Sequence, residues 1–309
     1  MRVISGPPRY YFLRRERGAR EEVAHWPPEV KPLEAPENLI CVGVRLHPED
    51  GAWRAEPVAQ EDDLNADANG AFVLTRQTTL GLRPDGVHET SVTLALLGVR
   101  VINEDGKGTE YASHLVLRVS GGMGLGPHTP LVVPIDSLLL GAYIERGSHA
   151  EAELDLRLTP AQVASMSPYL PDPIISRNVA RALDAAILSA QARHAITFEI
   201  EAGRVSLYGR AEISTFGDEA RAELEHTPGV VDISDHILYG ELLQQQVVEA
   251  LAERGYTDVD VLYEHGLVNL RGTVPDHASF HKAKDIALRI PGVRGVVNDL
   301  TVAGSVNAS

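Results

Sequence analysis

The feature that most constrains the fold of this chain is an internal repeat in its last third. Shifting the sequence by 63 residues places 196–237 on 259–300 without a gap. The aligned positions include the following turn-forming residues: Gly203 and Gly266, Gly209 and Gly272, Pro228-Gly229-Val230 and Pro291-Gly292-Val293. Because these residue types define turns and helix ends, the match predicts one small fold that occurs twice.

The hydrophobic pattern predicts the order of elements in each copy. An apolar stripe at helical spacing, such as Leu243, Val247 and Leu251, predicts a first helix. Alternating apolar residues then predict two strands joined by a tight turn at Gly203 or Gly266. A second helix, which in the second copy extends to Ile290, ends at the Pro-Gly pair, and a last strand completes the order α-β-β-α-β. In the first copy, Gly217 is expected to interrupt the second helix.

This order, with a glycine closing the second strand and Pro-Gly-Val before the third, resembles the BON family over residues 174–303. The second copy matches more closely, through two runs: Leu267-Val-Asn-Leu-Arg-Gly-Thr-Val-Pro275 and Pro291-Gly-Val-Arg-Gly-Val-Val-Asn-Asp-Leu300. We expect six glycines to hold turns or strand ends: Gly203, Gly209, Gly229, Gly266, Gly272 and Gly292.

The stretch from Thr90 to Tyr169 is typical of β structure. It contains an Asp-Gly turn at Gly106, the strand-like runs 115–119 and 131–135, and a closing Thr159-Pro-Ala-Gln162. The closing run is a capping box that starts a helix. Together these features resemble the PRC-barrel family, a small β-barrel. Residues 38–89 are expected to complete the barrel or to add strands to it.

The predicted fold class is therefore α+β, with an N-terminal β-rich, PRC-barrel-like domain followed by two BON-like modules. A length of 309 residues agrees with several domains, since one domain takes about 150 residues. The expected divisions are a basic, proline-rich N-terminal arm at 1–37, the β-rich domain at 38–173, and the two modules at 174–239 and 240–309.

The N-terminal arm differs from the acidic body in charge. Residues 1–20 contain six arginines and one acid, whereas the whole chain has a net charge of −15. Aromatic rings alternate with arginines there, which predicts a partner-binding segment made of Arg9, Tyr10, Tyr11, Phe12, Arg14, Arg15 and Arg17. No core is predicted near the rings, so their burial is expected from another chain or from the outer face of the barrel. A solvated tail is the alternative.

Composition limits the classes of partner and the compartment. The negative net charge disfavours a general role on nucleic acid or anionic lipid, because like charges repel. No window approaches the roughly 18 apolar residues that a membrane-spanning helix needs. The N-terminus carries prolines and arginines where a signal peptide has an apolar stretch, and the single cysteine, Cys41, cannot form an internal disulfide. These observations predict a cytoplasmic location.

The candidate chemical sites each have a structural explanation. Gly121-Gly-Met-Gly-Leu-Gly126 is followed by prolines and a strand, which favours a hairpin loop over a phosphate-binding loop. His277 and His281 could face one metal from a helix, but no third ligand is suitably spaced, which favours two exposed histidines. Cys41 lies in an apolar strand, which predicts a buried, inert thiol. The sequence predicts no catalytic residue, metal or cofactor.

The two family resemblances imply a non-catalytic role. BON modules are associated with lipid envelopes, secretion pores, channels and ion-binding proteins, and PRC barrels dock on ribosomal or photosynthetic assemblies. We therefore expect a scaffolding protein that docks partner proteins or assembles with itself, with a membrane surface as one setting and no specific nucleic acid. The alternative is a ligand or ion sensor with a cation between the repeats, near the acids Glu201, Asp258, Asp260 and Glu264.

Overall fold

The computed structural model describes residues 6–14, 38–60, 64, 71–83, 89–104, 108–120, 130–146, 149–186 and 196–303. Contacts divide the chain into two compact units. Unit 1 contains residues 1–178 together with two later segments, 200–205 and 227–232. Unit 2 contains residues 179–199, 206–226 and 233–309.

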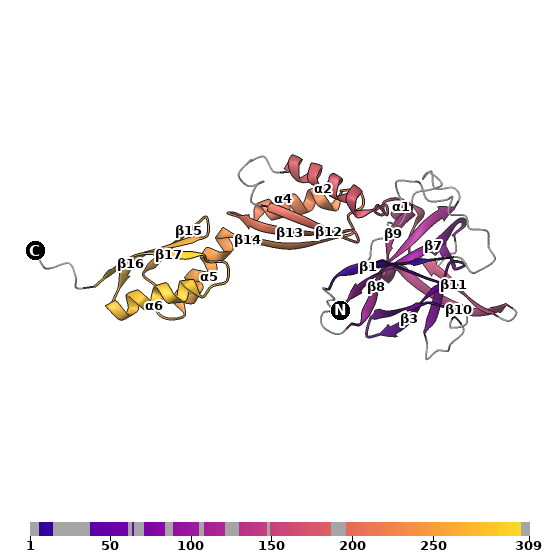
Figure 1. The fold of residues 1–309 in the computed structure, drawn as a ribbon, viewed down its shortest axis with the longest axis horizontal. Helices are drawn as coiled ribbons and strands as arrows, with labels where there is room; N and C mark the ends of the chain where they lie inside the picture. The colour runs from indigo at the N-terminus through magenta and orange to yellow at the C-terminus, as the bar shows by residue number, and fades with distance from the viewer. Residues whose placement is uncertain are drawn as a thin grey trace, which may run out of the picture. The chain divides into compact units, whose positions relative to one another are not determined.

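The β-rich domain is built on one 11-stranded sheet (Figure 1). Its strands are β1 (Pro8–Leu13), β2 (Leu39–Cys41), β3 (Gly43–Glu49), β4 (Ala52–Val58), β5 (Phe72–Thr75), β6 (Thr79–Leu82), β7 (Glu89–Asn103), β8 (Glu110–Ser120), β9 (Pro130–Pro134), β10 (Leu138–Arg146) and β11 (His149–Leu156). The main path is β10-β11-β6-β7-β8-β4-β3-β5, while β1 pairs with β2 and β7, and β9 pairs with β8. Strands from residues 39–82 thus belong to the same sheet as the stretch after residue 90.

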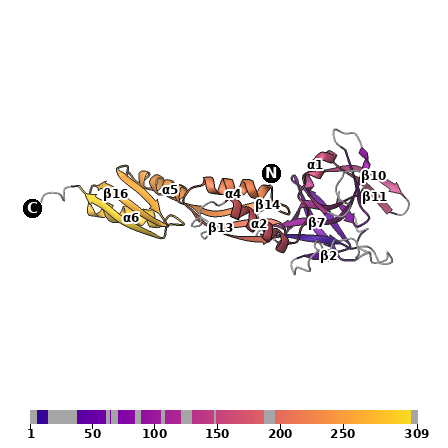
Figure 2. The same cartoon turned by 90° about the horizontal axis from the view of Figure 1, so that it is seen from above.

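The sheet of the β-rich domain is strongly curved in the view from above (Figure 2), and its buried side chains form an apolar core. Aliphatic side chains such as Leu46, Leu96, Leu117 and Leu156 are fully buried there. After β9 come a short 3-10 helix, η4 (Ile135–Ser137), and later α1 (Pro160–Ala164). The capping box predicted for α1 is present, with Thr159 and Gln162 bonded reciprocally and Pro160 at the first helical position.

The predicted N-terminal arm contains strand β1. β1 pairs antiparallel with β7, from Pro8↔Ile102 to Phe12↔Gly98, and parallel with β2. Tyr10, Tyr11 and Phe12 are between 0% and 5% exposed. The expectation of an arm over 1–37 with no core for these rings is therefore wrong at Pro8–Leu13. β1 is covered on both faces, so its apolar residues run consecutively and the alternation that identifies a half-buried strand is missing.

The first module contains α2 (Asp172–Ala186), β12 (Ile196–Glu201), β13 (Arg204–Ala211), α4 (Thr215–Glu225) and β14 (Asp232–Tyr239), with sheet order β12-β13-β14. Its first helix begins two residues before the expected boundary at 174. Gly217 lies inside α4, so the expected interruption of this helix is wrong. A Cβ at Gly217 would overlap the hydroxyl of Tyr239, so a larger residue there would require this side chain to move.

The second module contains α5 (Gly240–Ala252), β15 (Val259–Glu264), β16 (Leu267–Val274), α6 (His277–Leu288) and β17 (Gly295–Val302). β15 and β16 are antiparallel and β16 and β17 are parallel, and both helices cover the same face of this sheet (Figure 1). The predicted stripe of α5, formed by Leu243, Val247 and Leu251, is buried in the core. α6 ends at Leu288, two residues before its predicted end at Ile290.

The hairpin turns of the two modules have the same backbone conformation. Ala202 and Gly203 have φ values of 45° and 78°, and His265 and Gly266 have values of 51° and 92°. Two successive positive φ angles define a type I′ turn, whose twist matches that of a β-hairpin. The predicted tight turns therefore occur at Gly203 and Gly266.

The other repeated glycines also have positive φ. Gly229 and Gly292 follow the second helix of each module, where the chain leaves the helix. Gly209 and Gly272 lie inside β13 and β16 rather than at strand ends, which corrects their expected place. At Gly272 the φ of 126° brings the backbone against the carbonyl oxygen of Asp258, where a Cβ would collide.

No helix among the described residues is both long enough and apolar enough to cross a membrane.

Candidate functional site

A cluster of aromatic and aliphatic side chains lies on the outer face of the β-rich sheet. Tyr10 and Phe12 point to this face, while Tyr11 joins the core on the other side. Both rings contact Tyr169 edge to face, with centroids 5.2 and 5.6 Å away. We call this set the outer cluster: Tyr10, Phe12, Leu97, Val116, Val132, Tyr169 and Ala202. Ala202 belongs to the hairpin turn of the first module, so the outer cluster joins this turn to the β-rich sheet.

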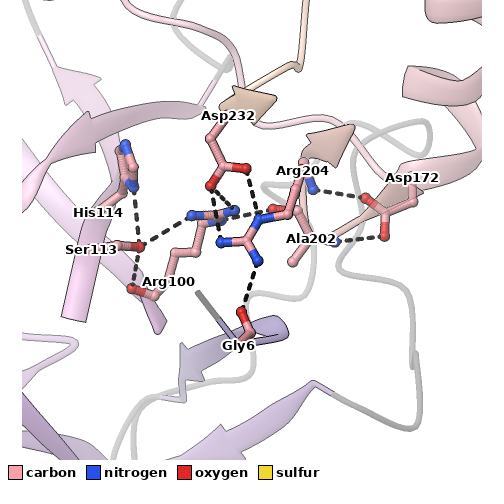
Figure 3. Close-up of polar contacts among 9 residues, drawn as sticks. Gly6, Arg100, Ser113, His114, Asp172, Ala202, Arg204 and Asp232 are labelled. Atoms are coloured by element: carbon pink, nitrogen blue, oxygen red, sulfur yellow. Dashed lines mark hydrogen bonds and ion pairs between the residues drawn. The ribbon is translucent and has the colours of Figure 1, made fainter. Parts of the chain in front are cut away.

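Arg100 lies beside the outer cluster on β7, opposite Tyr10 in the strand register. Its side chain is 0% exposed, yet each guanidinium nitrogen donates a hydrogen bond (Figure 3). Nε donates to the carbonyl oxygen of Ala202 at 2.8 Å, Nη1 to Ser113 Oγ at 3.2 Å, and Nη2 to Asp232 Oδ2 at 2.8 Å. A buried guanidinium is tolerated because each of its three nitrogens has an acceptor.

A second arginine binds the same carboxylate. Arg204 Nε donates to Asp232 Oδ1 at 2.8 Å, and its Nη1 donates to the carbonyl oxygen of Gly6 at 2.7 Å (Figure 3). Asp232 therefore lies between two guanidinium groups. We call Arg100, Ser113, Arg204 and Asp232 the Arg100 network. Its members come from β7, β8, β13 and β14, and all of them belong to unit 1.

The charges in the Arg100 network control the protonation of its neighbours. Burial alone would raise the pKa of Asp232, but the charges of Arg100 and Arg204 outweigh burial and lower it. Burial and then the charge of Arg100 lower the pKa of His114 to about 3, so this imidazole is neutral near pH 7. Its Nδ1 lies 3.1 Å from Ser113 Oγ. The two arginines thus favour the charged form of Asp232, and burial together with the charge of Arg100 favours the neutral form of His114.

Asp172 fixes the same hairpin turn from the start of α2. Its two carboxylate oxygens accept hydrogen bonds from the backbone N–H groups of Ala202 and Gly203, at 2.9 and 3.1 Å. The helix-exit glycine Gly229 donates its N–H to Ser167 Oγ at 3.1 Å. These bonds, with those of Arg100, hold segments 200–205 and 227–232 in unit 1.

The hairpin turn and the helix exit of the second module are held by hydrogen bonds from unit 2, as those of the first module are held within unit 1. The N–H of His265, which aligns with Ala202, donates to a carboxylate oxygen of Glu212 at 3.3 Å. Arg210 donates to the carbonyl oxygen of Gly292 at 3.1 Å and to the Tyr263 hydroxyl at 3.0 Å. In both modules an acid therefore binds at least one turn N–H, and an arginine from an earlier strand binds a carbonyl, that of the turn in the first module and that of the helix exit in the second.

The described residues of the predicted partner-binding arm have contacts within their own chain. Arg9 Nε lies 2.6 Å from Glu110 Oε1, and the Tyr11 hydroxyl donates to the same carboxylate. Arg14 donates to the carbonyl oxygen of Ala59 at 3.4 Å. Arg15 and Arg17 lie outside the described residues. Tyr11 therefore belongs to the core of the β-rich domain, while Tyr10 and Phe12 are buried in the outer cluster, on the outer face that was one of the two expected places.

The other predicted candidates do not converge on one site. His277 and His281 are exposed on α6, in agreement with the structural interpretation. Within the part of the chain that the structure describes, no three His, Cys, Asp or Glu residues are placed to hold a metal ion, and this part includes the four acids considered for a cation between the repeats. The glycine-rich loop at 121–126 lies outside the described residues.

Cys41 is buried, as its position in an apolar strand predicts. It is 1% exposed, and burial raises the pKa of its thiol to about 12. Because the thiolate is the reactive form, we expect a thiol reagent at pH 8 to label the folded chain roughly 1,000-fold more slowly than the urea-unfolded chain. Timed labelling followed by mass measurement tests this, and equal rates would contradict the burial of Cys41.

Sequence reasoning missed the members of the Arg100 network. One signal was present, because Arg100 interrupts a long apolar strand in which a charge needs a partner if it is buried. Asp172 precedes the first helix of the repeat, where an acid is expected to bind backbone N–H groups. Nothing in the sequence near Asp232 indicates that two arginines meet there.

Comparison with known proteins identifies one family. Residues 240–304 match the BON domain, so the C-terminal part of this chain contains a BON domain. No curated protein sequence matches the chain. The BON resemblance of residues 174–239 and the PRC-barrel resemblance of the β-rich domain stay predictions.

Two solved structures of CdsD from Chlamydia trachomatis show a weaker similarity. One is described as the C-terminal domain of this structural protein of the type III secretion system, with 16% identity over 43% of this chain and 67% of that one, and a TM-score of 0.35. The other has 17% identity over 42% and 65% of the two chains, with the same TM-score. The similarity thus spans about two thirds of those chains, and a TM-score this low does not establish a shared fold.

Proposed function

We propose that this chain is a non-catalytic scaffolding protein that docks partner proteins or assembles with itself. The observation that carries the proposal is the BON domain at 240–304, which follows a second module of the same element order. The Arg100 network supports a structural role for the buried charges. Arg100 and Arg204 bind the chain's own Ala202, Asp232 and Gly6, whereas a catalytic site needs polar groups that can meet a substrate.

The proposal extends to residues 174–239, to the β-rich domain and to the cellular location of the chain. We propose that residues 174–239 are a second BON-like module, which the shared type I′ turn and helix-exit glycine support. The β-rich domain would be a PRC-barrel-like docking module, with a cytoplasmic location and a membrane surface as one setting. These assignments make each domain a separate binding face on one chain.

The test is the state of the full chain in its native cells. Tagged chain is cross-linked, purified and analysed by quantitative mass spectrometry, with an unrelated tagged protein of similar net charge as the control. Native mass measurement and sedimentation of the purified chain give its stoichiometry. We expect either a partner in fixed ratio to the chain or a defined oligomer. An isolated monomer in both experiments would contradict the proposal.

A further inference from the structure

The exposed side of α6 has a net positive charge, from two lysines against one acid, on a chain that is acidic overall. The sequence contains four lysines, and two of them, Lys282 and Lys284, are exposed on α6, although the chain has a net charge of −15. α6 buries Ala283 and Ala287 against its sheet. At 3.6 residues per turn, the two lysines border the opposite side of the helix, and Leu288, 42% exposed, lies between them together with the exposed acid Asp285.

The equivalent helix of the first module has the opposite charge. The 63-residue shift places Glu219 on Lys282, whereas Arg221 falls on Lys284, so the difference lies in the net charge of the two helices. α4 carries four acids and one arginine: Asp218, Glu219, Glu223, Glu225 and Arg221. It buries Gly217, Ala220 and Leu224, while Asp218, Ala222 and Glu225 follow one exposed stripe at i, i+4 and i+7. The α4 and α6 faces are thus complementary in charge.

The fold of the modules does not require this difference in charge. Each helix needs apolar or small residues toward its sheet, and its exposed positions accept either sign at little cost to stability. In this structure the acids of the α4 stripe and the lysines of α6 are all exposed. Their complementarity is therefore available to a contact between molecules.

We propose that α6 of one copy docks on α4 of a second copy. The proposal rests on the scaffolding function above and names its partner. The two surfaces differ, so the contact is heterologous and leads to a ring or an open array. Paired charges bring the copies together against their general repulsion, and Leu288 packs toward Ala222 in the middle of the interface. All three candidates repel the rest of this acidic chain, but a second copy is favoured over nucleic acid or anionic lipid because it also offers the folded acidic stripe of α4.

The test uses charge reversal in the full chain. We compare the wild type, Lys282→Glu/Lys284→Glu and Asp218→Lys/Glu225→Lys by sedimentation equilibrium at low ionic strength. Each double variant alone should associate at least roughly tenfold more weakly than the wild type, because reversal turns two or more attractions into repulsions. An equimolar mixture of the two variants should recover the association, since each then offers the charge that the other lacks. Added salt should weaken the wild-type association.

The matched control reverses two arginines on another helix. Arg177→Glu/Arg181→Glu changes the net charge as much as the lysine variant does, at exposed positions of α2, and should associate like the wild type. Circular dichroism verifies that all variants are folded. A monomeric wild type, unchanged variants, a control as weak as the lysine variant, or a mixture that stays dissociated would each overturn the proposal.

A further experiment tests the scaffolding function separately from the contact between α4 and α6. Co-purification from native cells is repeated with the Lys282→Glu/Lys284→Glu chain. If the wild type is monomeric but recovers another protein in fixed ratio, docking between copies is wrong and the scaffolding function stands. If the wild type neither associates nor recovers a partner, both are wrong.

Discussion

Replacing Asp232 with alanine should lower the free energy of unfolding by about 3 kcal/mol. The Arg100 guanidinium is 0% exposed and would keep its charge without the carboxylate that balances it. Removing one partner of a buried ion pair costs about 3 to 5 kcal/mol, and we take the lower value because the Asp232 side chain is 32% exposed. Urea unfolding followed by circular dichroism measures the change. A loss below about 1 kcal/mol would show that the network does not stabilise the fold.

A double-mutant cycle separates the ion pair from its surroundings. Arg100→Met keeps much of the side-chain volume and removes the buried charge. The double variant Arg100→Met/Asp232→Ala should be more stable than the sum of the two single losses implies, by about 1 kcal/mol or more. Strict additivity would mean that the two side chains act independently, contrary to their 2.8 Å contact.

The effect of Asp232→Ala should depend on pH. The pKa of Asp232 is lowered in the folded chain, so its stabilisation is fully present above the ordinary value of 3.8 and is lost as the pH falls through the folded value. The difference in unfolding free energy between wild type and variant should therefore be constant near neutral pH and shrink below about pH 4. A difference that grows on acidification would contradict this sign.

Replacing Gly272 with alanine should destabilise the BON domain by about 3 kcal/mol or more. The residue has a φ of 126°, a region that side chains rarely adopt, and the new Cβ would collide with the carbonyl oxygen of Asp258. That oxygen belongs to the backbone next to β15 and cannot rotate away. Because a module of this size has a small core, such a loss takes a large share of its stability.

The matched control for Gly272→Ala is Gly255→Ala. Gly255 also has a positive φ, 84°, but nothing lies within 4 Å of its added Cβ. Its substitution should cost only the backbone strain, about 1 kcal/mol. Hydrogen exchange of residues 240–303 at increasing urea compares the two variants. Equal protection in both would show that the contact with Asp258 does not matter.

The local sequence was sufficient to predict most of the helices, strands and turns of the second module. The stripe of α5, the turn at Gly266 and the helix exit at Gly292 involve residues close together in the chain. A helix stripe, a type I′ turn and a helix exit each depend on only a few neighbouring side chains and φ angles, so the pattern specifies them directly. The capping box at Thr159 was predictable for the same reason.

Tertiary structure decided the role of β1 and the location of the Arg100 network. Tyr10, Tyr11 and Phe12 have the pattern of a binding arm until β7 and β2 pair along the edges of β1, and the core and the outer cluster cover its two faces. Arg100 and Asp232 are 132 residues apart in the sequence, and no local preference connects them. Burial and charge pairing at such separations depend on how the whole chain closes, so only the folded molecule determines them, whereas the repeat and its turns are specified by the sequence itself.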